Sequence, residues 1–406
     1  MKHVIIGAGA AGISAAETIR KFNKQDEIVI ISIDDCIHSR CMLHHYISGE
    51  RDEKGLSFVS GDFFAKNNIR WVNGKTVTGL DTDKKLVCFS NGSEAFDKLL
   101  IATGADSVYL PFLQPQAHKN VLGLRHLSDA RAIKEQAKDA ENIVIIGAGL
   151  VGMDAAYAFA EMKKKPVVID LFGSILALNL DAYTAQVYKN KFEEEGCVFH
   201  LNRKVTETET NAEGKVVSLT MDSGEKLPCD LVIVAVGTRP STGFLANSGI
   251  NCGRGITVNE CLETNVKGIY AAGDVTGLSG VWPNAVKQGE VAAKNMCGIK
   301  AVYGDKLAMK NTINFYGILS LSLGKTEPDG NETVKIRMYR NNYEKIVMRD
   351  GVIVGVLLQG DITNGGFWQF LIKNSIDVSK INKQVFDLTF ADFYGMQENH
   401  EYEWVV

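Results

Sequence analysis

Two glycine-rich segments, 140 positions apart, have the residue types and the spacing needed to hold a diphosphate. Each carries the pattern G-x-G-x-x-G directly after an apolar run. The glycines are Gly7, Gly9, Gly12, Gly147, Gly149 and Gly152. In such a pattern the first glycine permits a tight turn, the second lets the backbone approach a pyrophosphate, and the third lets a helix pack closely on a strand. Two copies with similar flanks therefore predict two dinucleotide-binding sites.

The elements that must position these loops can be predicted around each motif. Each motif follows a short apolar run that predicts a strand and precedes an Ala-rich stretch that predicts a helix, and a second strand is expected at 28–32 and at 166–170. The N-terminus of each helix would present unpaired N–H groups and a positive dipole to a diphosphate. Three further apolar runs end in glycine turns, at 99–105, 231–240 and 264–274. The expected fold class is α/β.

The order of these motifs resembles the pyridine nucleotide–disulfide oxidoreductase superfamily over residues 1–300. The resemblance implies two Rossmann-like domains, with an NAD domain inserted in an FAD domain, and a C-terminal α+β interface domain. The implied division is 1–110 and 241–310 for FAD, 111–240 for NAD, and 311–406 for the interface domain. The residues expected to contact FAD or NAD are Gly7, Gly9, Ala11, Gly12, Ser32, Arg40, Thr103, Gly104, Gly147, Gly149, Gly152, Asp170, Gly237, Gly273, Asp274, Trp282 and Ala285.

Two of these positions receive specific roles from the resemblance. Asp274 would accept a hydrogen bond from the flavin ribityl chain. The helix that begins at Trp282 would point its N-terminus at the isoalloxazine, where its dipole stabilises negative charge near N1. A place in the core is the alternative for Trp282 itself.

The end of the second strand in each repeat indicates which dinucleotide is preferred. Asp170 lies 18 residues after Gly152, where a carboxylate accepts from the ribose 2′-OH of NAD and repels the 2′-phosphate of NADP. The next six residues contain no Arg or Lys, so NADH is favoured. In the first repeat the corresponding residue is Ser32, where an Asp or Glu would bind the ribose hydroxyls better. Asp34 and Asp35 follow closely and are the alternative ligands for that ribose.

The segment 35–50 should face the flavin, and it resembles three branches of the superfamily. Cys36 and Cys41 have the C-x4-C spacing of the redox disulfide in glutathione-reductase-like enzymes, but the Gly before and the Pro-Lys after the second cysteine are absent. Cys41 with the residues after it also resembles the single-cysteine branch, which includes coenzyme A disulfide reductase. The first glycine loop has Ala10 and Ala11 in place of the His found in NADH oxidases and peroxidases of that branch.

The third branch contains NADH:rubredoxin reductases and the flavin domains of assimilatory nitrite reductases, and it fits 39–50 without a gap. In this branch Arg40 lies near the flavin and no cysteine is needed. Asp154 occupies the position where relatives have Glu beside the nicotinamide. His44 and His45 would contact flavin or nicotinamide, with an ordinary polar helix position as the alternative for either. The residues expected at the reaction site are Arg40, Cys41, His44 and Asp154.

Three functions remain open at this point. The first is an FAD-dependent NADH oxidoreductase that passes electrons to an iron–sulfur or other redox protein, such as rubredoxin, ferredoxin or a metalloenzyme that has this chain as its flavoprotein subunit. The second is a thiol-dependent disulfide or persulfide reductase that uses Cys41. The third is a non-catalytic FAD-binding scaffold, which no residue supports.

The last hundred residues change to strands, expected at 312–323, 333–340, 343–349 and 352–359, with a hairpin turn at Asp350-Gly351 and a helix at 366–374. The layout resembles the interface domain of the superfamily. It implies a homo-oligomer or a hetero-complex formed through this domain. The aromatic residues near 390–394 are expected to bury against a partner chain.

Composition excludes several other classes. A net charge of −4 on 406 residues gives no reason to expect nucleic acid or a membrane surface as a partner. No apolar run approaches the roughly 18 residues that span a bilayer, and no signal peptide is expected, so the predicted location is the cytoplasm. The eight cysteines include no C-x-x-C pair, so no zinc or iron–sulfur site and no bound metal is expected.

Overall fold

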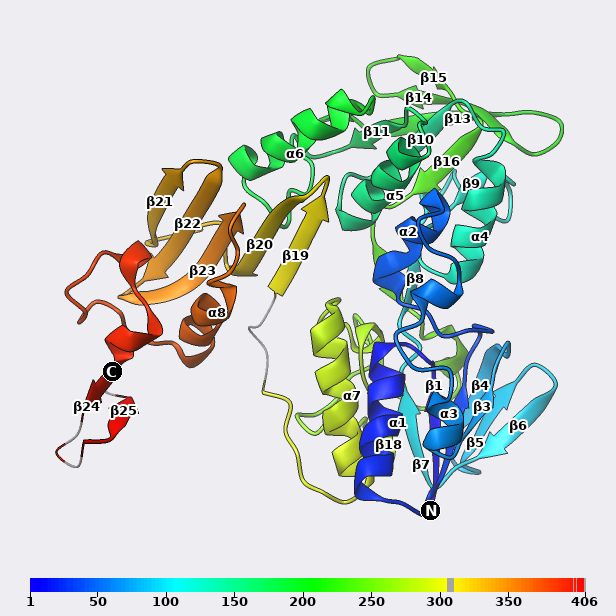
Figure 1. Ribbon diagram of the computed structural model, residues 1–406. Coiled ribbons are helices and arrows are strands. Elements are labelled where there is room, and N and C mark those ends of the chain that lie inside the picture. Colours follow the sequence, from blue (N-terminus) through cyan, green and yellow to red (C-terminus); the bar gives the residue numbers. More distant parts are fainter. Residues whose placement is uncertain (305–309, 397, 399, 405–406) are drawn as a thin grey trace. The chain divides into compact units, whose positions relative to one another are not determined.

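The computed structural model describes residues 1–304, 310–396, 398 and 400–404. It separates into two compact units (Figure 1). One contains Met1–Phe172 with Glu195–Lys306, and the other contains Gly173–Glu194 with Leu307–Val406. The finer division into four segments stays a prediction.

The first sheet is parallel, with strand order β18-β7-β1-β2-β3. Its strands are β1 (Lys2–Ile6), β2 (Glu27–Ile31), β3 (Ile69–Val72), β7 (Lys98–Ile101) and β18 (Ile269–Ala271). Continuous apolar runs are expected in such strands because both faces of a parallel sheet are covered. Successive residues of β1 accordingly enter different cores: Ile5 joins one hydrophobic cluster, and Val4 and Ile6 join another.

Two long helices and a small antiparallel sheet cover these faces. Helices α1 (Ala10–Phe22) and α7 (Trp282–Met296) lie side by side (Figure 1). They approach so closely that a Cβ on Gly289 would stand 2.2 Å from the carbonyl oxygen of Ala11. The other cluster includes residues of β4 (Val77–Asp81) and β5 (Leu86–Phe89), which form a three-stranded sheet with β6 (Gly92–Ala95).

The second parallel sheet repeats the arrangement with strand order β12-β11-β10-β16-β9. Its strands are β9 (Val121–Leu122), β10 (Ile143–Ile146), β11 (Val167–Asp170), β12 (Val198–Leu201) and β16 (Leu231–Val234). The nearby helices are α4 (Leu127–Gln136) and α5 (Leu150–Glu161), and an antiparallel sheet is formed by β13 (Val205–Thr210), β14 (Val216–Met221) and β15 (Lys226–Pro228). Both expected α/β repeats are thus confirmed.

The chain crosses between the two parallel sheets twice, and the crossings pair with each other. β8 (Ala105–Ser107) follows β7, β17 (Thr238–Pro240) follows β16, and the two form an antiparallel ribbon. Short elements complete this unit: η1 (Arg40–Met42), α2 (Leu43–Ser48), η2 (Lys54–Leu56), α3 (Phe63–Lys66), η3 (Gly243–Leu245) and η4 (Asp274–Thr276). Helix α2 packs against α4 and α5.

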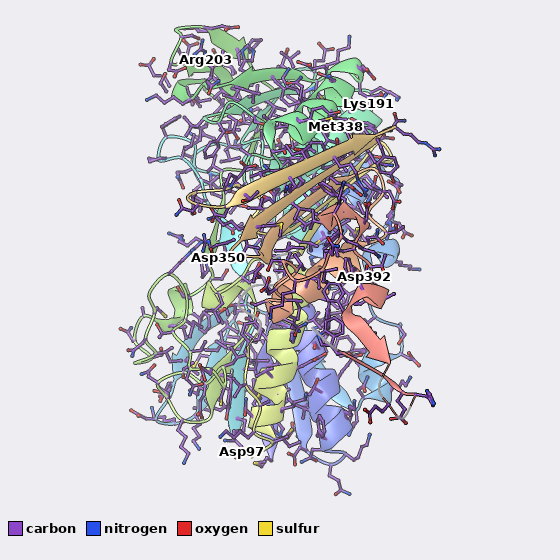
Figure 2. The ribbon with its side chains drawn as sticks, turned by 90° about the vertical axis from the view of Figure 1, so that its left-hand side faces the viewer. Asp97, Lys191, Arg203, Met338, Asp350 and Asp392 are labelled. Carbon is purple, nitrogen blue, oxygen red and sulfur yellow. The ribbon has the colours of Figure 1, made fainter. Side chains whose placement is uncertain are left out.

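The second unit is built on an antiparallel sheet of order β19-β20-β23-β22-β21. The strands are β19 (Lys310–Phe315), β20 (Ile318–Gly324), β21 (Thr333–Tyr339), β22 (Asn342–Arg349) and β23 (Val352–Gln359), and α8 (Gly365–Asn374) packs on β20 and β23. The turn between β22 and β23 is the predicted Asp350-Gly351 hairpin, and Figure 2 labels Asp350 there. Elements η5 (Val385–Asp387), η6 (Phe390–Phe393), β24 (Tyr394–Met396) and β25 (Tyr402–Trp404) follow.

One expected strand of this unit is wrong. Residues 312–323 are not continuous but form the β19–β20 hairpin, because Tyr316 and Gly317 both adopt positive φ (54° and 76°). Two central residues with positive φ give the turn that matches the twist of a hairpin. A Tyr in the first of these positions is uncommon, which is why the turn was missed.

Helix α6 (Ala182–Glu194) also belongs to this unit. The hydroxyl of Tyr188 lies 2.8 Å from the carbonyl oxygen of Ile318 and 3.2 Å from that of Ile313. Within the described part of the chain, no helix combines the length and the apolar character needed to cross a bilayer.

Candidate functional site

The first glycine loop is tightly packed at its first and last glycines, whereas its middle glycine faces open space. Gly7 has a φ of +106°, and a Cβ there would lie 2.2 Å from the carbonyl oxygen of Ala102. A Cβ on Gly12 would lie 2.0 Å from the carbonyl oxygen of Gly7. At Gly9, the residue before helix α1, a Cβ would meet no protein atom within 4 Å. The loop therefore leaves room beside the helix N-terminus, as the approach of a diphosphate requires.

The second glycine loop has the same geometry. Gly147 has a φ of +109° and would place a Cβ 2.4 Å from the carbonyl oxygen of Ala235. A Cβ on Gly152 would lie 1.8 Å from the carbonyl oxygen of Gly147, whereas a Cβ on Gly149 would meet no protein atom within 4 Å. Gly237, after β16, is also open and has a φ of +133°.

Asp170, at the end of β11, is tied to this second loop. One carboxylate oxygen accepts from the backbone N–H of Ala148 at 2.5 Å, and the other accepts from the N–H of Phe172 at 2.7 Å. The carboxylate is thus held beside the loop and fixes the first residues after β11. A carboxylate oxygen has capacity for further donors, so these bonds leave room for a ribose hydroxyl.

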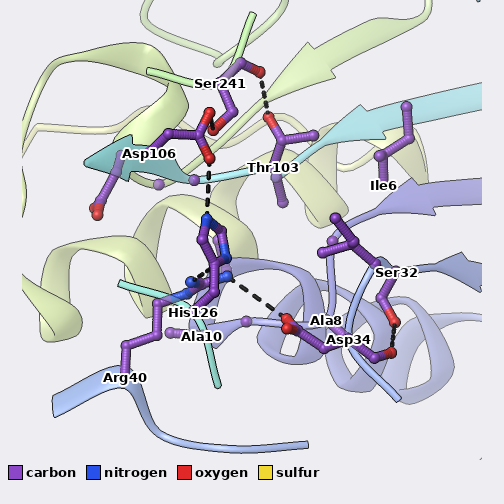
Figure 3. Close-up of a pocket in the computed structure, with 18 of the residues that line it drawn as sticks. Ile6, Ala8, Ala10, Ser32, Asp34, Arg40, Thr103, Asp106, His126 and Ser241 are labelled. Atoms are coloured by element: carbon purple, nitrogen blue, oxygen red, sulfur yellow. Dashed lines mark hydrogen bonds and ion pairs between the residues drawn. The ribbon is translucent and has the colours of Figure 1, made fainter. Parts of the chain in front are cut away.

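A cavity of about 340 Å³ opens beside the first loop (Figure 3). This volume lies within the range of roughly 300–1,000 Å³ that is usual for small-molecule sites. The expected FAD-contacting residues that line it are Gly7, Gly9, Ala11, Ser32, Arg40, Thr103, Gly104, Gly273, Asp274, Trp282 and Ala285. Gly12 does not line it, because it faces the loop backbone. The open cradle at Gly9 and this lining fit a dinucleotide.

Arg40 reaches this cavity from the segment before α2 and is fixed by several acceptors. Its Nη1 donates to the carbonyl oxygen of Arg125 at 2.7 Å and lies 3.0 Å from Nδ1 of His126. Its Nη2 is 3.6 Å from the Asp34 carboxylate. Figure 3 shows these side chains converging on the cavity.

The chain of contacts continues beyond His126. Nε2 of His126 lies 3.0 Å from the carboxylate of Asp106, which also accepts from the Ser241 hydroxyl at 2.7 Å. The Thr103 hydroxyl donates to the carbonyl oxygen of Ser241 at 3.0 Å. Asp106 lies on β8 and Ser241 follows β17, so both crossings between the sheets contribute to the wall.

Arg125 is a site residue that the sequence analysis missed. Its guanidinium pairs with the carboxylate of Asp274, the expected ribityl ligand, and its Nε donates to the carbonyl oxygen of Ala105 at 3.1 Å. Arg125 and His126 precede α4, and the Asp129 carboxylate in its first turn accepts from the backbone N–H groups of both. An acid three residues after the residue that precedes a helix is the sequence signal that could have marked this helix start.

Ser32 lies on the cavity wall where an acid was expected to bind a ribose. The Ser32 hydroxyl accepts from Nε1 of Trp71 at 2.9 Å and donates to the carbonyl oxygen of Asp34 at 2.8 Å. Asp34 lines the cavity, whereas Asp35 pairs with Arg131 and does not. Of the two substitutes expected for the ribose acid, the structure therefore brings Asp34 to the cavity.

The two cysteines of this segment differ in their surroundings. Cys41 lines the cavity and Cys36 does not, and all eight cysteines are free thiols. Desolvation is the first cause that raises the pKa of the Cys41 thiol, and the negative charge of Asp154 is the second. Burial, with the charge of Asp35, raises the pKa of Cys36 to about 11. Neither thiol has the lowered pKa that marks a reactive cysteine.

His44 and Asp154 meet each other but do not line the cavity. Nδ1 of His44, on α2, is 3.7 Å from the carboxylate of Asp154 on α5. Burial raises the pKa of Asp154 to about 8. Burial, followed by the charges of His45 and Arg51, lowers the pKa of His44 to about 3. Both groups are therefore held largely uncharged at neutral pH, where α2 packs on α5.

Comparison with known proteins agrees with this geometry. Residues 1–289 match the family model described as "Pyridine nucleotide-disulphide oxidoreductase", and the chain belongs to this family. It is 30% identical to a nitrite reductase [NAD(P)H] of Bacillus subtilis over 94% of this chain and 48% of the relative. It is 31% identical to an NADH oxidase of Methanocaldococcus jannaschii over 75% of this chain and 71% of the relative.

A solved structure extends the likeness to the whole fold. The NADH:rubredoxin oxidoreductase of Clostridium acetobutylicum superposes with a TM-score of 0.75 at 26% identity, over 94% of this chain and 97% of that chain. The family uses FAD and NAD(H) for oxidation and reduction, and the chain is an oxidoreductase of that kind. The chain spans about half the length of the curated relatives it matches first.

Proposed function

We propose that this protein is an NADH-dependent flavoprotein reductase that passes electrons from NADH through FAD to a redox protein. The observation that supports the proposal most strongly is the set of residues that line the cavity beside the first glycine loop. A fixed guanidinium, Arg40, lines it together with a thiol whose pKa is raised. That arrangement suits transfer that needs no thiolate. An NADH:rubredoxin oxidoreductase and an electron transfer subunit of assimilatory nitrate reductase among the similar proteins support a redox protein as the acceptor.

The residues of the chain would bind and orient the two cofactors. FAD accepts a hydride from a nicotinamide and can release electrons one at a time. The N-terminus of α1 would face its diphosphate, and the N-terminus of α7, at Trp282, would face its ring system. Asp274, neutralised by Arg125, would accept from the ribityl chain. Asp170 would accept from the NADH ribose, and Asp154 and His44 would stand beside the nicotinamide.

The acceptor is a rubredoxin, a ferredoxin, or a metalloenzyme of which this chain is the flavoprotein subunit. The second unit is proposed to form the interface with a like or unlike chain. Phe370, Phe390 and Tyr394 are 36%, 45% and 47% exposed there, and such aromatics commonly bury in an interface. A cytoplasmic location is proposed because all eight cysteines are free thiols.

A second candidate function is a disulfide or persulfide reductase that uses Cys41. The exposure of Cys41 at the cavity favours it. The direction of its pKa opposes it, since attack on a disulfide requires a thiolate.

The test is steady-state NADH oxidation by the flavin-loaded protein with each class of acceptor. We expect rapid reduction of rubredoxin or ferredoxin and slow reduction of coenzyme A disulfide and polysulfide. Fast reduction of the sulfur compounds, with none of any iron–sulfur protein, refutes the proposal. Purification from the native source under mild conditions then shows whether a metalloenzyme copurifies as the larger complex.

A further inference from the structure

His126 is bonded at both ring nitrogens to groups from other segments of the chain. Nδ1 lies 3.0 Å from Nη1 of Arg40, and Nε2 lies 3.0 Å from the Asp106 carboxylate. A guanidinium has only donors, so Nδ1 must accept, and the ring proton belongs on Nε2, where it is donated to Asp106. The contacts therefore select one neutral tautomer of His126.

Arg40 depends on this tautomer for its position. The two hydrogens of its Nη1 are taken by the carbonyl oxygen of Arg125 and by His126. Its Nη2 lies 3.6 Å from the carboxylate of Asp34, and both residues line the cavity. Asp106 is itself fixed by the Ser241 hydroxyl at 2.7 Å. The imidazole thus connects the Arg40 segment with both crossings between the sheets (Figure 3).

We propose that His126 is a positioning residue that, while neutral, holds Arg40 in place at the flavin cavity, and that proton uptake by the imidazole releases Arg40 and weakens FAD binding. A protonated Nδ1 would point its hydrogen at the guanidinium, so the hydrogen bond would be lost and two cations would face each other. The inference rests on the proposed function, because it requires that the cavity holds FAD.

Charged groups from several elements surround His126. On its own segment the Asp129 carboxylate accepts from the backbone N–H groups of Arg125 and His126. The groups that face the imidazole from other elements are Asp106 on β8 and Arg40 before α2, with Asp34 and the Arg125–Asp274 pair beyond them. The Asp106 carboxylate therefore contacts one ring nitrogen and the Arg40 guanidinium contacts the other.

Two neighbouring imidazoles are not candidates for the same role. Burial lowers the pKa of His38, and burial lowers that of His44 to about 3. Proton uptake by either ring is therefore less favourable than in an ordinary imidazole.

The experiment measures retention of FAD rather than turnover. The flavin-loaded protein is diluted at a series of pH values between about 8 and 5.5, the interval of imidazole titration, and released flavin is measured by its fluorescence. We expect the apparent Kd for FAD to rise roughly tenfold as the pH falls, which is the size of one lost hydrogen bond to a charged group. In His126→Asn the rise should disappear, because the amide oxygen accepts from Arg40 at every pH, and Asn is a favoured residue at the position before a helix.

Matched variants decide the outcome. His118→Asn removes an imidazole that bonds to the carbonyl oxygen of Phe112, outside the cavity lining, and should keep the wild-type response. Asp106→Asn removes the charge that favours the protonated ring, and should move the midpoint of release to lower pH even if His126→Asn does not fold. A wild type with pH-independent retention, or a His126→Asn protein with the wild-type response, overturns the inference. A folded protein that binds no FAD at pH 8 refutes the proposed function, and the inference falls with it.

Discussion

Alanine substitutions at Gly9 and Gly12 should separate cofactor binding from folding. Gly9 has an extended backbone (φ −83°, ψ −169°) that alanine adopts freely, and a Cβ there meets no protein atom within 4 Å. Gly9→Ala should therefore leave the free energy of unfolding of the flavin-free chain unchanged or higher by up to about 1 kcal/mol. The new methyl group would occupy the space beside the helix N-terminus. Loss of one close contact with the diphosphate would lower FAD affinity by about 1.5–3 kcal/mol, or roughly tenfold to a hundredfold.

Gly12→Ala should have the opposite profile. Its Cβ would lie 2.0 Å from the carbonyl oxygen of Gly7, which is backbone and cannot rotate away. Helix α1 must then move off β1, at a cost of about 1–3 kcal/mol or more to folding. The second loop provides a matched pair. A Cβ on Gly149 would face open space, and a Cβ on Gly152 would lie 1.8 Å from the carbonyl oxygen of Gly147.

The assay combines urea unfolding of each flavin-free variant with titration of FAD followed by fluorescence. Gly149→Ala should retain FAD and lose affinity for NADH, which shows that the effect is local to each loop. A Gly9→Ala protein that binds FAD like the wild type would refute the placement of the diphosphate at this loop. Equal destabilisation by Gly9→Ala and Gly12→Ala would refute the packing argument.

Three further predictions address single residues of the site. Flavin bleaching should be faster with NADH than with NADPH, and Asp170→Ser should reduce that ratio roughly tenfold, since one charged acceptor is lost; a wild type that prefers NADPH contradicts the sign. Cys41→Ser should keep NADH-driven bleaching and turnover with a protein acceptor, as its raised pKa indicates; loss of all turnover would favour the thiol mechanism. For Asp154, burial raises the folded-state pKa to about 8, against about 4 when unfolded. The folded state binds more protons between these values, so this group makes stability fall as the pH rises from about 4 to 8. Asp154→Asn should flatten that slope in urea unfolding, and an unchanged slope would contradict the argument.

The parts of the fold that were predictable from the sequence are those set by local pattern. The strand, glycine loop and helix around Gly7 and Gly147 lie within a few residues of one another, so spacing alone determines them. The Asp350-Gly351 turn is equally local. The β19–β20 hairpin could not be predicted because Tyr316 adopts a positive φ, which a Tyr rarely does.

The wall of the cavity could not be predicted in the same way, because it is assembled from distant segments. Arg40 meets His126 across 86 positions, and Arg125 meets Asp274 across 149. Ser32 is bonded to Trp71, 39 positions on, a partner that no spacing rule suggests. The pairing of His44 with Asp154, away from the cavity lining, likewise depends on how α2 packs on α5.

The pairing of β18 with β7 has a consequence for synthesis of the protein on the ribosome. Leu99 pairs with Ile269, so the first sheet lacks its last strand until 170 further residues have been translated. At roughly 5–20 residues per second, that interval is about 10–30 s. During it the β7 edge carries unpaired backbone groups, and helix α7 is not yet present to cover α1. The nascent chain therefore exposes an incomplete, strongly apolar sheet for many seconds, and cotranslational chaperones are expected to engage it there.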